Sequence, residues 1–249
     1  MKDSTGKRSS GDFLPTRRKQ TQASQGVVQS DVIHFCSHLP PMSNLPNLAF
    51  SPAADRNKQA ILDVLRTVLP NKGSALEIAS GTGQHISFFA AAMPGWCWQA
   101  SDADAAALPW IAAYVKQQQQ TNIFAPVRLD VLATQWPASG DAFTEPFDAI
   151  YCANMLHIAP WATCAALMQG SHRHLATGGV LITYGPYLED DVPTAPGNLA
   201  FDESLRTQNP TWGIRRREDV TEAARRAGLR LRERHAMPAN NLLLVWRKL

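Results

Sequence analysis

The stretch Leu76-Glu-Ile-Ala-Ser-Gly-Thr-Gly-Gln-His85 decides the fold of this chain. Residues 74–79 have the small and apolar composition of a short buried strand, with one acid, Glu77, near its end. Residues 80–83 break that pattern, and residues 84–92 resume with helical spacing. Strand, glycine-rich turn and helix are the layout with which α/β proteins hold nucleotides, because the glycines let the main chain approach the ligand and the helix presents free N–H groups.

The spacing of the small residues narrows the choice of nucleotide. A dinucleotide fingerprint requires a small residue three positions after Gly83, and Ile86 stands there. A P-loop is excluded because no Gly-Lys-Ser/Thr follows the turn. Glu-x-x-x-Gly-x-Gly, formed by Glu77, Gly81 and Gly83, instead resembles motif I of the class I S-adenosylmethionine (SAM) methyltransferases. That resemblance implies glycines under the sulfonium cofactor and an acid near its methionine part; a turn without a ligand is the alternative.

Two further acids follow the next predicted strands. Asp102 ends the strand 96–101, about 20 residues after the glycine turn, where a carboxylate can accept hydrogen bonds from ribose hydroxyls. Asp130 follows the strand 125–129, and in a methyltransferase-like sheet this acid lies beside the adenine. An NAD-dependent oxidoreductase would explain Asp102 but has no particular use for Asp130. The acids therefore favour SAM over a dinucleotide.

Length and composition bound the class of protein. A chain of 249 residues suits one domain with a tail, and 45% apolar with 18% charged residues is ordinary for a globular protein. The formal net charge of +3 makes no case for a nucleic-acid partner, and no apolar run approaches the roughly 20 residues that span a bilayer. The four cysteines lack CxxC spacing, so we expect no metal site, and reduced thiols in a cytoplasmic protein.

Residues 1–45 have a different composition from the rest. Serine, threonine, glutamine, lysine and arginine dominate, and such a segment cannot bury enough apolar surface to offset its ordering entropy. We expect a disordered, basic and polar tail, followed by one domain over residues 46–249. Met42 is an alternative initiator, from which the domain would read naturally.

The first helix is predicted to begin at Ser51-Pro52, an N-cap followed by proline at the first helical position. A helix directly before the first strand runs antiparallel to it, so Arg56 and Asn57 should lie at the carboxyl edge of the sheet, where ligands bind. An ordinary surface arginine is the competing interpretation of Arg56. Asp104 is interpreted as the cap of a helix over residues 105–119.

The fourth strand, 147–153, ends in a polar loop that opens a helix over residues 161–175. Its carboxyl end is where the transferable methyl group should point. Asn154 and His157 are therefore candidates for the reacting centre, since histidine can act as general base near neutral pH and asparagine can orient a nucleophile. A histidine that bonds only to the main chain at the start of a helix is the alternative for His157.

The rest of the chain supplies further candidates for the acceptor side. The fifth strand, 178–184, is followed by Gly185-Pro-Tyr187, and we expect Tyr184 and Tyr187 on the ligand side. Residues 189–217 are predicted to be a long irregular insertion that closes over the substrate or decorates the periphery. Two strands, 229–236 and 242–248, are joined by a turn with Asn240 and Asn241, which suits both αL geometry and recognition.

Longer strings in this order resemble the DUF938 family, also called UPF0585, which includes the methyltransferase-like 26 proteins. They are Phe-Ser-Pro-Ala-Ala-Asp-Arg-Asn (50–57), the glycine-turn stretch (76–85), Asn-Met-Leu-His-Ile-Ala-Pro-Trp (154–161), Tyr-Gly-Pro-Tyr (184–187), Asn-Leu-Ala-Phe-Asp-Glu-Ser-Leu-Arg (198–206), Trp-Gly-Ile-Arg (212–215) and Met-Pro-Ala-Asn-Asn (237–241). The resemblance covers about residues 47–249. It implies a SAM-dependent methyltransferase fold without fixing the acceptor.

The sequence thus predicts an α/β, Rossmann-like class I methyltransferase fold, with a seven-stranded, mostly parallel sheet, its last strand antiparallel, and helices on both faces. The predicted function is methyl transfer from SAM to an O, N or S atom of a small molecule. A non-catalytic SAM-binding scaffold and, with less support, an NAD-dependent oxidoreductase are the alternatives. The residues predicted to hold the cofactor are Glu77, Ser80, Gly81, Gly83, His85, Asp102, Asp130 and Asn154. Those predicted to face the acceptor are Asn154, His157 and Tyr184 as catalytic groups, and Arg56, Asn57, Tyr187, Asn240 and Asn241 as binding groups.

Overall fold

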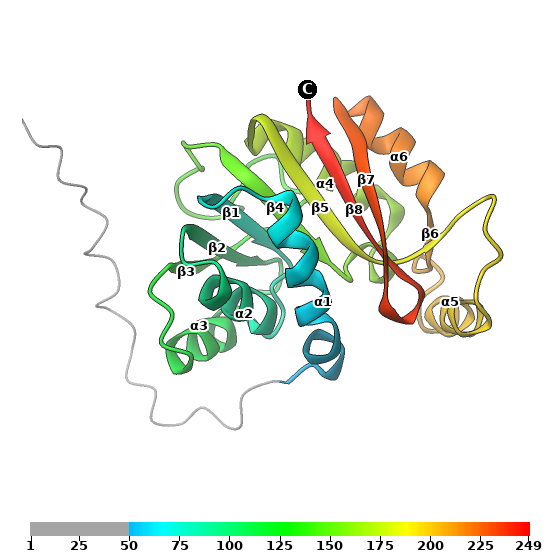
Figure 1. Ribbon diagram of the computed structural model, residues 1–249, viewed down its shortest axis with the longest axis horizontal. Helices are drawn as coiled ribbons and strands as arrows, with labels where there is room; N and C mark the ends of the chain where they lie inside the picture. The colour runs from blue at the N-terminus through cyan, green and yellow to red at the C-terminus, as the bar shows by residue number, and fades with distance from the viewer. Residues whose placement is uncertain (1–49) are drawn as a thin grey trace, which may run out of the picture. The chain divides into compact units, whose positions relative to one another are not determined.

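A computed structural model describes residues 50–249 (Figure 1). The predicted tail over residues 1–45, the alternative initiator Met42 and Cys36 lie outside the described residues. None of the helices in the described part of the chain is long and apolar enough to cross a bilayer.

The core of the fold is one mixed sheet with the strand order β3-β2-β1-β4-β5-β8-β7. These strands are β1 (Gly73–Ile78), β2 (Trp96–Asp102), β3 (Ile123–Arg128), β4 (Phe147–Ala153), β5 (Leu175–Leu188), β7 (Leu229–Met237) and β8 (Asn241–Lys248). β1 to β5 pair in parallel, while β8 is antiparallel to both β5 and β7. A short strand, β6 (Arg215–Arg216), pairs with the end of β5. The predicted fold class is confirmed, including the antiparallel last strand, which the structure places between β5 and β7.

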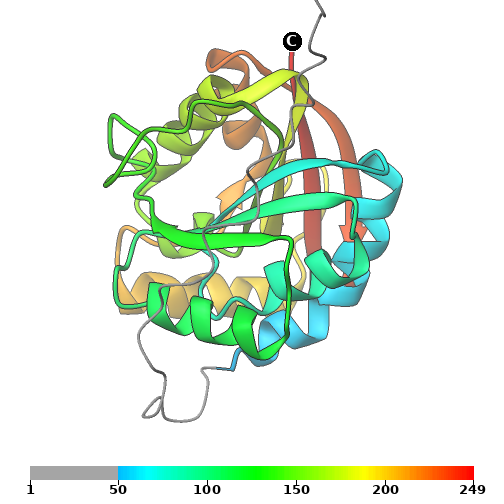
Figure 2. The ribbon, with the colours of Figure 1, turned by 90° about the vertical axis from the view of Figure 1, so that its left-hand side faces the viewer.

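Helices cover both faces of the sheet (Figures 1 and 2). Helices α1 (Pro52–Val68), α2 (Gln84–Ala92) and α3 (Leu108–Gln117) pack on one face, and α4 (Trp161–His174) and α6 (Arg217–Arg226) pack on the other. Successive side chains of a strand point to opposite faces, so each strand contributes to both hydrophobic clusters. Ala75 packs with α1 and α2, for example, whereas Leu76 packs with α4.

Several predicted elements differ from the structure. β5 (Leu175–Leu188) is longer at both ends than the predicted strand 178–184 and includes Tyr187. The third helix begins at Leu108 rather than at residue 105, because Asp104 caps a turn: its Oδ1 accepts a hydrogen bond from Ala106 N at 2.9 Å. The segment 189–217, predicted to be irregular, contains the helix α5 (Pro196–Gln208) and the strand β6. Leu205 is the only residue of α5 that is buried. A helix with one buried position leaves no apolar stripe in the sequence, so its period could not be detected.

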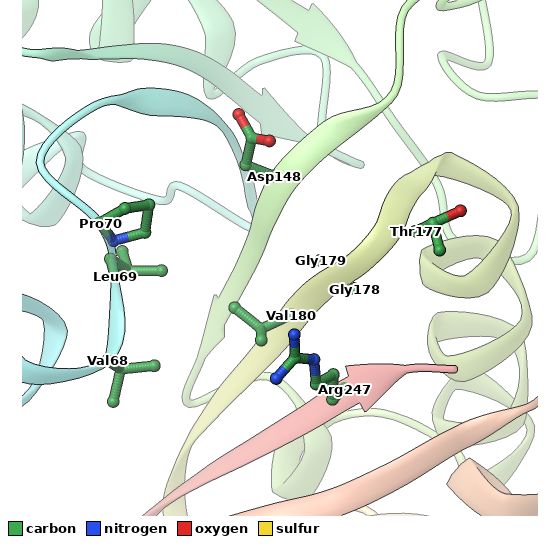
Figure 3. A pocket seen from close by; sticks show the side chains of 9 residues that line it. All are labelled: Val68, Leu69, Pro70, Asp148, Thr177, Gly178, Gly179, Val180 and Arg247. Carbon is green, nitrogen blue, oxygen red and sulfur yellow. The ribbon is translucent and has the colours of Figure 1, made fainter.

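The carboxyl ends of β1 to β5 meet at one edge of the sheet, and three other segments reach the same edge. One is the first turn of α1, one is α5, and one is the short helix η2 (Pro238–Asn240) between β7 and β8. Both ribbon views place α5 along this edge (Figures 1 and 2). A cavity of about 310 Å³ lies at the opposite edge, between the end of α1, the Gly178-Gly179 turn and Arg247 of β8 (Figure 3). The candidate site lies at the other edge, where the carboxyl ends of β1 to β5 meet.

Candidate active site

The two glycines of the turn between β1 and α2 have different surroundings. Both have positive φ, +58° at Gly81 and +75° at Gly83, where other residues are strained. A Cβ on Gly83 would lie 3.4 Å from Cα of Ile111, in van der Waals contact with α3. A Cβ on Gly81 would come no nearer to other atoms than 4.0 Å, from the Ala79 carbonyl oxygen. The space above Gly81 is therefore open to a ligand.

Two serines tie the turn to the neighbouring strand β2. Ser80 N donates to Ser101 O at 2.8 Å, and Ser101 N donates to Ser80 Oγ at 3.1 Å. The hydroxyl of Ser101 in turn donates to the carbonyl oxygen of Glu77 at 2.6 Å. Because the polar groups of the turn are satisfied by β2, the turn is held in one conformation before any ligand binds. Ser80, predicted to bind the cofactor, supports the turn in this way.

Glu77 is a buried acid with an unpaired oxygen. Its side chain is 2% exposed, and its Oε2 has no hydrogen-bond partner among the described residues. The pKa of Glu77 is raised to about 8, mainly by burial; the hydrogen bond from the Ser80 side chain opposes this rise, and the nearby charge of Asp102 adds to it. An orphaned buried carboxyl is costly in a folded protein unless a partner binds there. This position is suited to a cationic group of a ligand.

The two other predicted acids lie at the same edge as Glu77. Asp102 is half-buried, and its Oδ2 accepts from Gly81 N at 2.9 Å while its Oδ1 accepts from Asp104 N at 3.0 Å. Asp130 is also half-buried, just past β3, and its Oδ1 accepts from Leu132 N at 2.9 Å. A carboxylate oxygen has two lone pairs, so each acid keeps the capacity to accept from a ligand hydroxyl or amine.

The first turn of α1 is fixed onto the glycine turn. Ser51 N donates to Oε1 of Gln84 at 2.5 Å, and the hydroxyl of Thr82 donates to the same oxygen at 2.9 Å. As predicted, α1 starts at the ligand edge, with Ser51 as N-cap and proline at the first helical position. Of the two candidates on this helix, Asn57 points inward and is 9% exposed, whereas the side chain of Arg56 is exposed.

Asn57 belongs to a buried polar cluster on the α1 face of the sheet, which we define as Asn57, Glu77, His85, Tyr151 and Tyr184. Oδ1 of Asn57 lies 2.7 Å from Nε2 of His85. Burial raises the pKa of Tyr184, and the side chains of Asn57 and Asn241 partly oppose this rise. Burial lowers the pKa of His85 to about 4, so its imidazole is neutral at physiological pH.

Tyr151 is a member of this cluster that the sequence analysis missed. It is paired in register with Glu77 across β1 and β4, and its ring contacts that of His85 edge-on, with centroids 6.0 Å apart. Its hydroxyl is buried without a hydrogen-bond partner among the described residues, and burial raises its pKa well above the ordinary value. Strand alternation within β4 was the signal that could have placed Tyr151 beside Glu77.

Tyr187 does not join the cluster. Tyr184 and Tyr187 are three positions apart on one strand, so their side chains point to opposite faces of the sheet. The Tyr187 hydroxyl donates to Thr183 Oγ1 at 2.8 Å, within the core formed with α4 and α6. The expectation that both tyrosines emerge on the ligand side is therefore corrected: only Tyr184 lies with the other candidates.

Asn154 and His157 converge at the end of β4. Asn154 has φ +56°, and its N–H donates to Tyr184 O at 2.8 Å. A Cβ on Gly185 would lie 3.4 Å from Nδ1 of His157 and 3.7 Å from Oδ1 of Asn154, so the three residues meet. His157 is 6% exposed, and burial, assisted by the charge of Arg215, lowers its pKa to about 4. A neutral imidazole is the form that accepts a proton.

The segment containing α5 and β6 covers this end of the site. The ring of Phe201 contacts that of His157 at a centroid distance of 5.5 Å. Gly213 N donates to the carbonyl oxygen of His157 at 3.0 Å, and Nδ2 of Asn198 donates to the carbonyl oxygen of Asn240 at 3.0 Å. The insertion therefore contacts both the loop after β4 and the turn with the predicted residues Asn240 and Asn241.

Strained backbone gathers at the same edge. Among the described residues, five other than glycine have a positive φ: Ala79, Gln119, Asn154, Ala239 and Asn240. All but Gln119 lie at the carboxyl edge: Ala79 directly after β1, Asn154 directly after β4, and Ala239 and Asn240 in η2. Such conformations cost about 1–3 kcal/mol each and concentrate at functional sites, so this distribution supports the location of the site independently of the side chains.

Comparison with known families fits this geometry. A family model described as "Protein of unknown function (DUF938)" matches residues 48–248, most of the chain. The chain belongs to the DUF938 family. The resemblance seen in the sequence motifs is thus confirmed, and the DUF938 match covers every element of the candidate site.

Solved structures similar to this DUF938 protein are methyltransferases in fold. An O-methyltransferase family protein from Burkholderia thailandensis is 14% identical with a TM-score of 0.64, covering 79% of this chain and 57% of its own. CalO1, a methyltransferase of calicheamicin biosynthesis solved in its SAH-bound form, is 15% identical with a TM-score of 0.62, covering 77% and 54%. A candidate methyltransferase from Bacillus halodurans C-125 is 17% identical with a TM-score of 0.59, covering 76% and 99%. The chain spans little more than half the length of the first two, and the likeness shows a shared fold.

Proposed function

We propose that this chain is a SAM-dependent methyltransferase that acts on an O, N or S atom of a small molecule. The observation that carries the proposal is the buried carboxyl of Glu77, whose Oε2 has no partner among the described residues, beside a two-glycine turn, with Asp102 and Asp130 at the ends of the next two strands. The proposed partner is a small molecule rather than a nucleic acid or a membrane, and the proposed location is the cytoplasm. The methyltransferase fold of the similar structures supports the same conclusion.

The residues at the carboxyl edge suit SAM. Glu77 would pair with its cationic amino-acid part, Asp102 would accept from ribose hydroxyls and Asp130 from the adenine amine. The open space above Gly81 would let the main chain pass under the ligand. A dinucleotide would leave Asp130 without a role, so the donor and acceptor pattern fits SAM better than NAD.

When bound, SAM supplies a methyl group on a sulfonium sulfur, already activated for in-line displacement. The chain then has to align the nucleophile and exclude water, which accounts for much of the rate in such reactions. Asn154 would orient the acceptor, and His157, neutral and buried under Phe201, would receive the proton that the acceptor loses. Tyr184, in the buried cluster with Asn57 and Glu77 and next to Gly185, would lie between the residues proposed to hold the cofactor and those proposed to face the acceptor.

Calorimetry of the full chain with SAM, S-adenosylhomocysteine (SAH) and NAD tests the proposal. We expect micromolar binding of SAM and SAH and none of NAD; NAD binding without SAM binding would overturn the cofactor assignment. His157→Ala should retain SAH binding and lower methyl transfer in a screen of small-molecule acceptors with labelled SAM. SAM binding with no transfer to any acceptor would favour a non-catalytic scaffold instead.

A further inference from the structure

Arg215 is a half-buried arginine whose donors are directed to main-chain carbonyl groups rather than to an acid. Its Nε donates to Leu156 O at 3.0 Å, and one terminal nitrogen donates to Ala159 O at 2.5 Å and to Thr211 O at 2.9 Å. Its guanidinium also lies over the ring of Trp161, 5.9 Å from the centroid. Two of these carbonyl groups flank His157 in sequence, so the guanidinium spans the loop that carries this histidine.

The position of Arg215 is itself fixed by the sheet. β6 pairs in parallel with the end of β5, with Arg215 opposite Tyr187. Two residues earlier, Gly213 N donates to the carbonyl oxygen of His157. The loop after β4 is thus held through its carbonyl groups at positions 156, 157 and 159 by one short segment of the insertion. Charge-assisted hydrogen bonds to carbonyl oxygens are stronger than neutral ones, and a guanidinium presents several in a rigid fork.

We propose that Arg215 is the positioning residue of the active site, which locks the loop 154–159 so that His157 is presented to the acceptor. Arg215 does not touch the reacting atoms in this proposal; it acts through His157. The proposal rests on the proposed function for the meaning of that position, but the lock itself concerns only contacts within the chain. A second consequence is electrostatic: the charge of Arg215 adds to the effect of burial, lowers the pKa of His157 and favours the neutral form of its imidazole.

The two effects can be separated by two substitutions at the same position. Arg215→Lys keeps the positive charge but replaces the fork by a single ammonium group, which cannot hold both carbonyl groups in the same geometry. Arg215→Gln removes the charge as well. Arg216→Gln is the matched control, because the adjacent arginine carries the same charge but is exposed and paired with Asp190 and Asp219.

The experiment uses the full chain without ligand and two NMR readouts. Hydrogen exchange at Ile158 N, which donates to Met155 O, and at Gly213 N reports the lock. A pH titration of the labelled His157 ring reports its environment. We expect exchange at both amides to accelerate about tenfold in Arg215→Lys with little change in the His157 titration, since losing one such hydrogen bond costs about 1.4 kcal/mol. Arg215→Gln should accelerate exchange and also raise the pKa of His157, while Arg216→Gln should change neither.

Unchanged exchange in a folded Arg215→Lys would overturn the lock, and an unchanged His157 titration in Arg215→Gln would overturn its electrostatic part. Near-UV circular dichroism establishes that each variant is folded; if Arg215→Gln does not fold, Arg215→Lys still tests the lock. Calorimetry with SAH on the same samples keeps the two proposals apart. If the wild-type chain does not bind SAH, the proposed function fails, whereas the exchange and titration results still decide the role of Arg215.

Discussion

Replacing Glu77 by glutamine should change how the stability of the protein depends on pH. The pKa of this carboxyl is raised from 4.5 to about 8 by its burial, so the folded state keeps a proton that the unfolded state releases. The resulting stability is fully present below about pH 4.5 and is lost as the pH rises through 8. Each pH unit in this window costs about 1.4 kcal/mol of the free energy of unfolding, or about 5 kcal/mol over the whole window.

Glutamine is nearly isosteric with glutamic acid and does not titrate. The difference in the free energy of unfolding between Glu77→Gln and the wild type should therefore rise in favour of the variant by about 2.7 kcal/mol from about pH 5.5 to about pH 7.5. Urea unfolding of both proteins, followed by tryptophan fluorescence at three pH values, measures it. Taking the difference cancels the groups that titrate equally in both proteins.

Glu203→Gln is the control, because it removes the same carboxyl from an exposed position on α5. A change in the Glu77→Gln difference of less than about 0.5 kcal/mol across this range, or one no larger than that of the control, would refute the reasoning that burial dominates at Glu77. The same variant should bind SAM more weakly, because glutamine, unlike Glu77, cannot release a proton on binding and pair as a carboxylate with the cationic part of the proposed cofactor.

The imidazoles of His85 and His157, both with a pKa lowered to about 4 by burial, should stay neutral down to about pH 5 in an NMR titration of the folded protein. Because the unfolded state takes up these protons first, they remove stability as the pH falls from about 6.5 towards 4; titration of both rings near 6.5 would contradict their burial. Gly81→Ala and Gly83→Ala should each lower the free energy of unfolding by about 1 kcal/mol, since both positions have a positive φ at which alanine is strained, and an unchanged midpoint in urea unfolding would refute this strain. Asp102→Ala should weaken SAH binding in calorimetry at least tenfold, and unchanged affinity would remove this acid from the proposed cofactor site.

Much of the ligand edge was predictable because strong local signals mark it. The β1–turn–α2 unit is set by the two glycines, and each of Asp102 and Asp130 follows the strand predicted for it. The Asn240-Asn241 turn reached the same edge because an antiparallel last strand brings it there. These residues lie at the ends of predicted strands, so the order of the strands is enough to place them at the carboxyl edge of the sheet.

Side-chain direction was harder to predict than strand position. Tyr187 differs from Tyr184 by an odd number of residues along β5, and the alternation of a strand sends it into the opposite core. Arg56 and Asn57 are adjacent on α1, and successive helical residues lie about 100° apart, so only one of them faces the sheet. Tyr151 was not predicted as a site residue, because the mostly apolar strand 147–153 gives no sign that one of its side chains carries a buried hydroxyl.

The insertion was the least predictable part, since tertiary contacts rather than an apolar stripe determine it. α5 is fixed by hydrogen bonds and by one aromatic contact, which leave little pattern in the sequence. The role of Arg215 is similarly invisible there, because main-chain carbonyl groups are present at every residue and give no sequence signal. Contacts of this kind can be identified only from a structure.

A helix that buries a single leucine is weakly attached. Burial of Leu205 contributes roughly 2 kcal/mol, and the hydrogen bond of Asn198 and the contact of Phe201 with His157 about 1 kcal/mol each, so α5 can detach for about 4 kcal/mol. That is less than the 5–15 kcal/mol that typically separates a folded domain from its unfolded state. About one molecule in a thousand would then have α5 released at any moment, and the sheet would remain intact beneath it. A ligand could thus reach His157, and a product could leave, by brief departures of one helix.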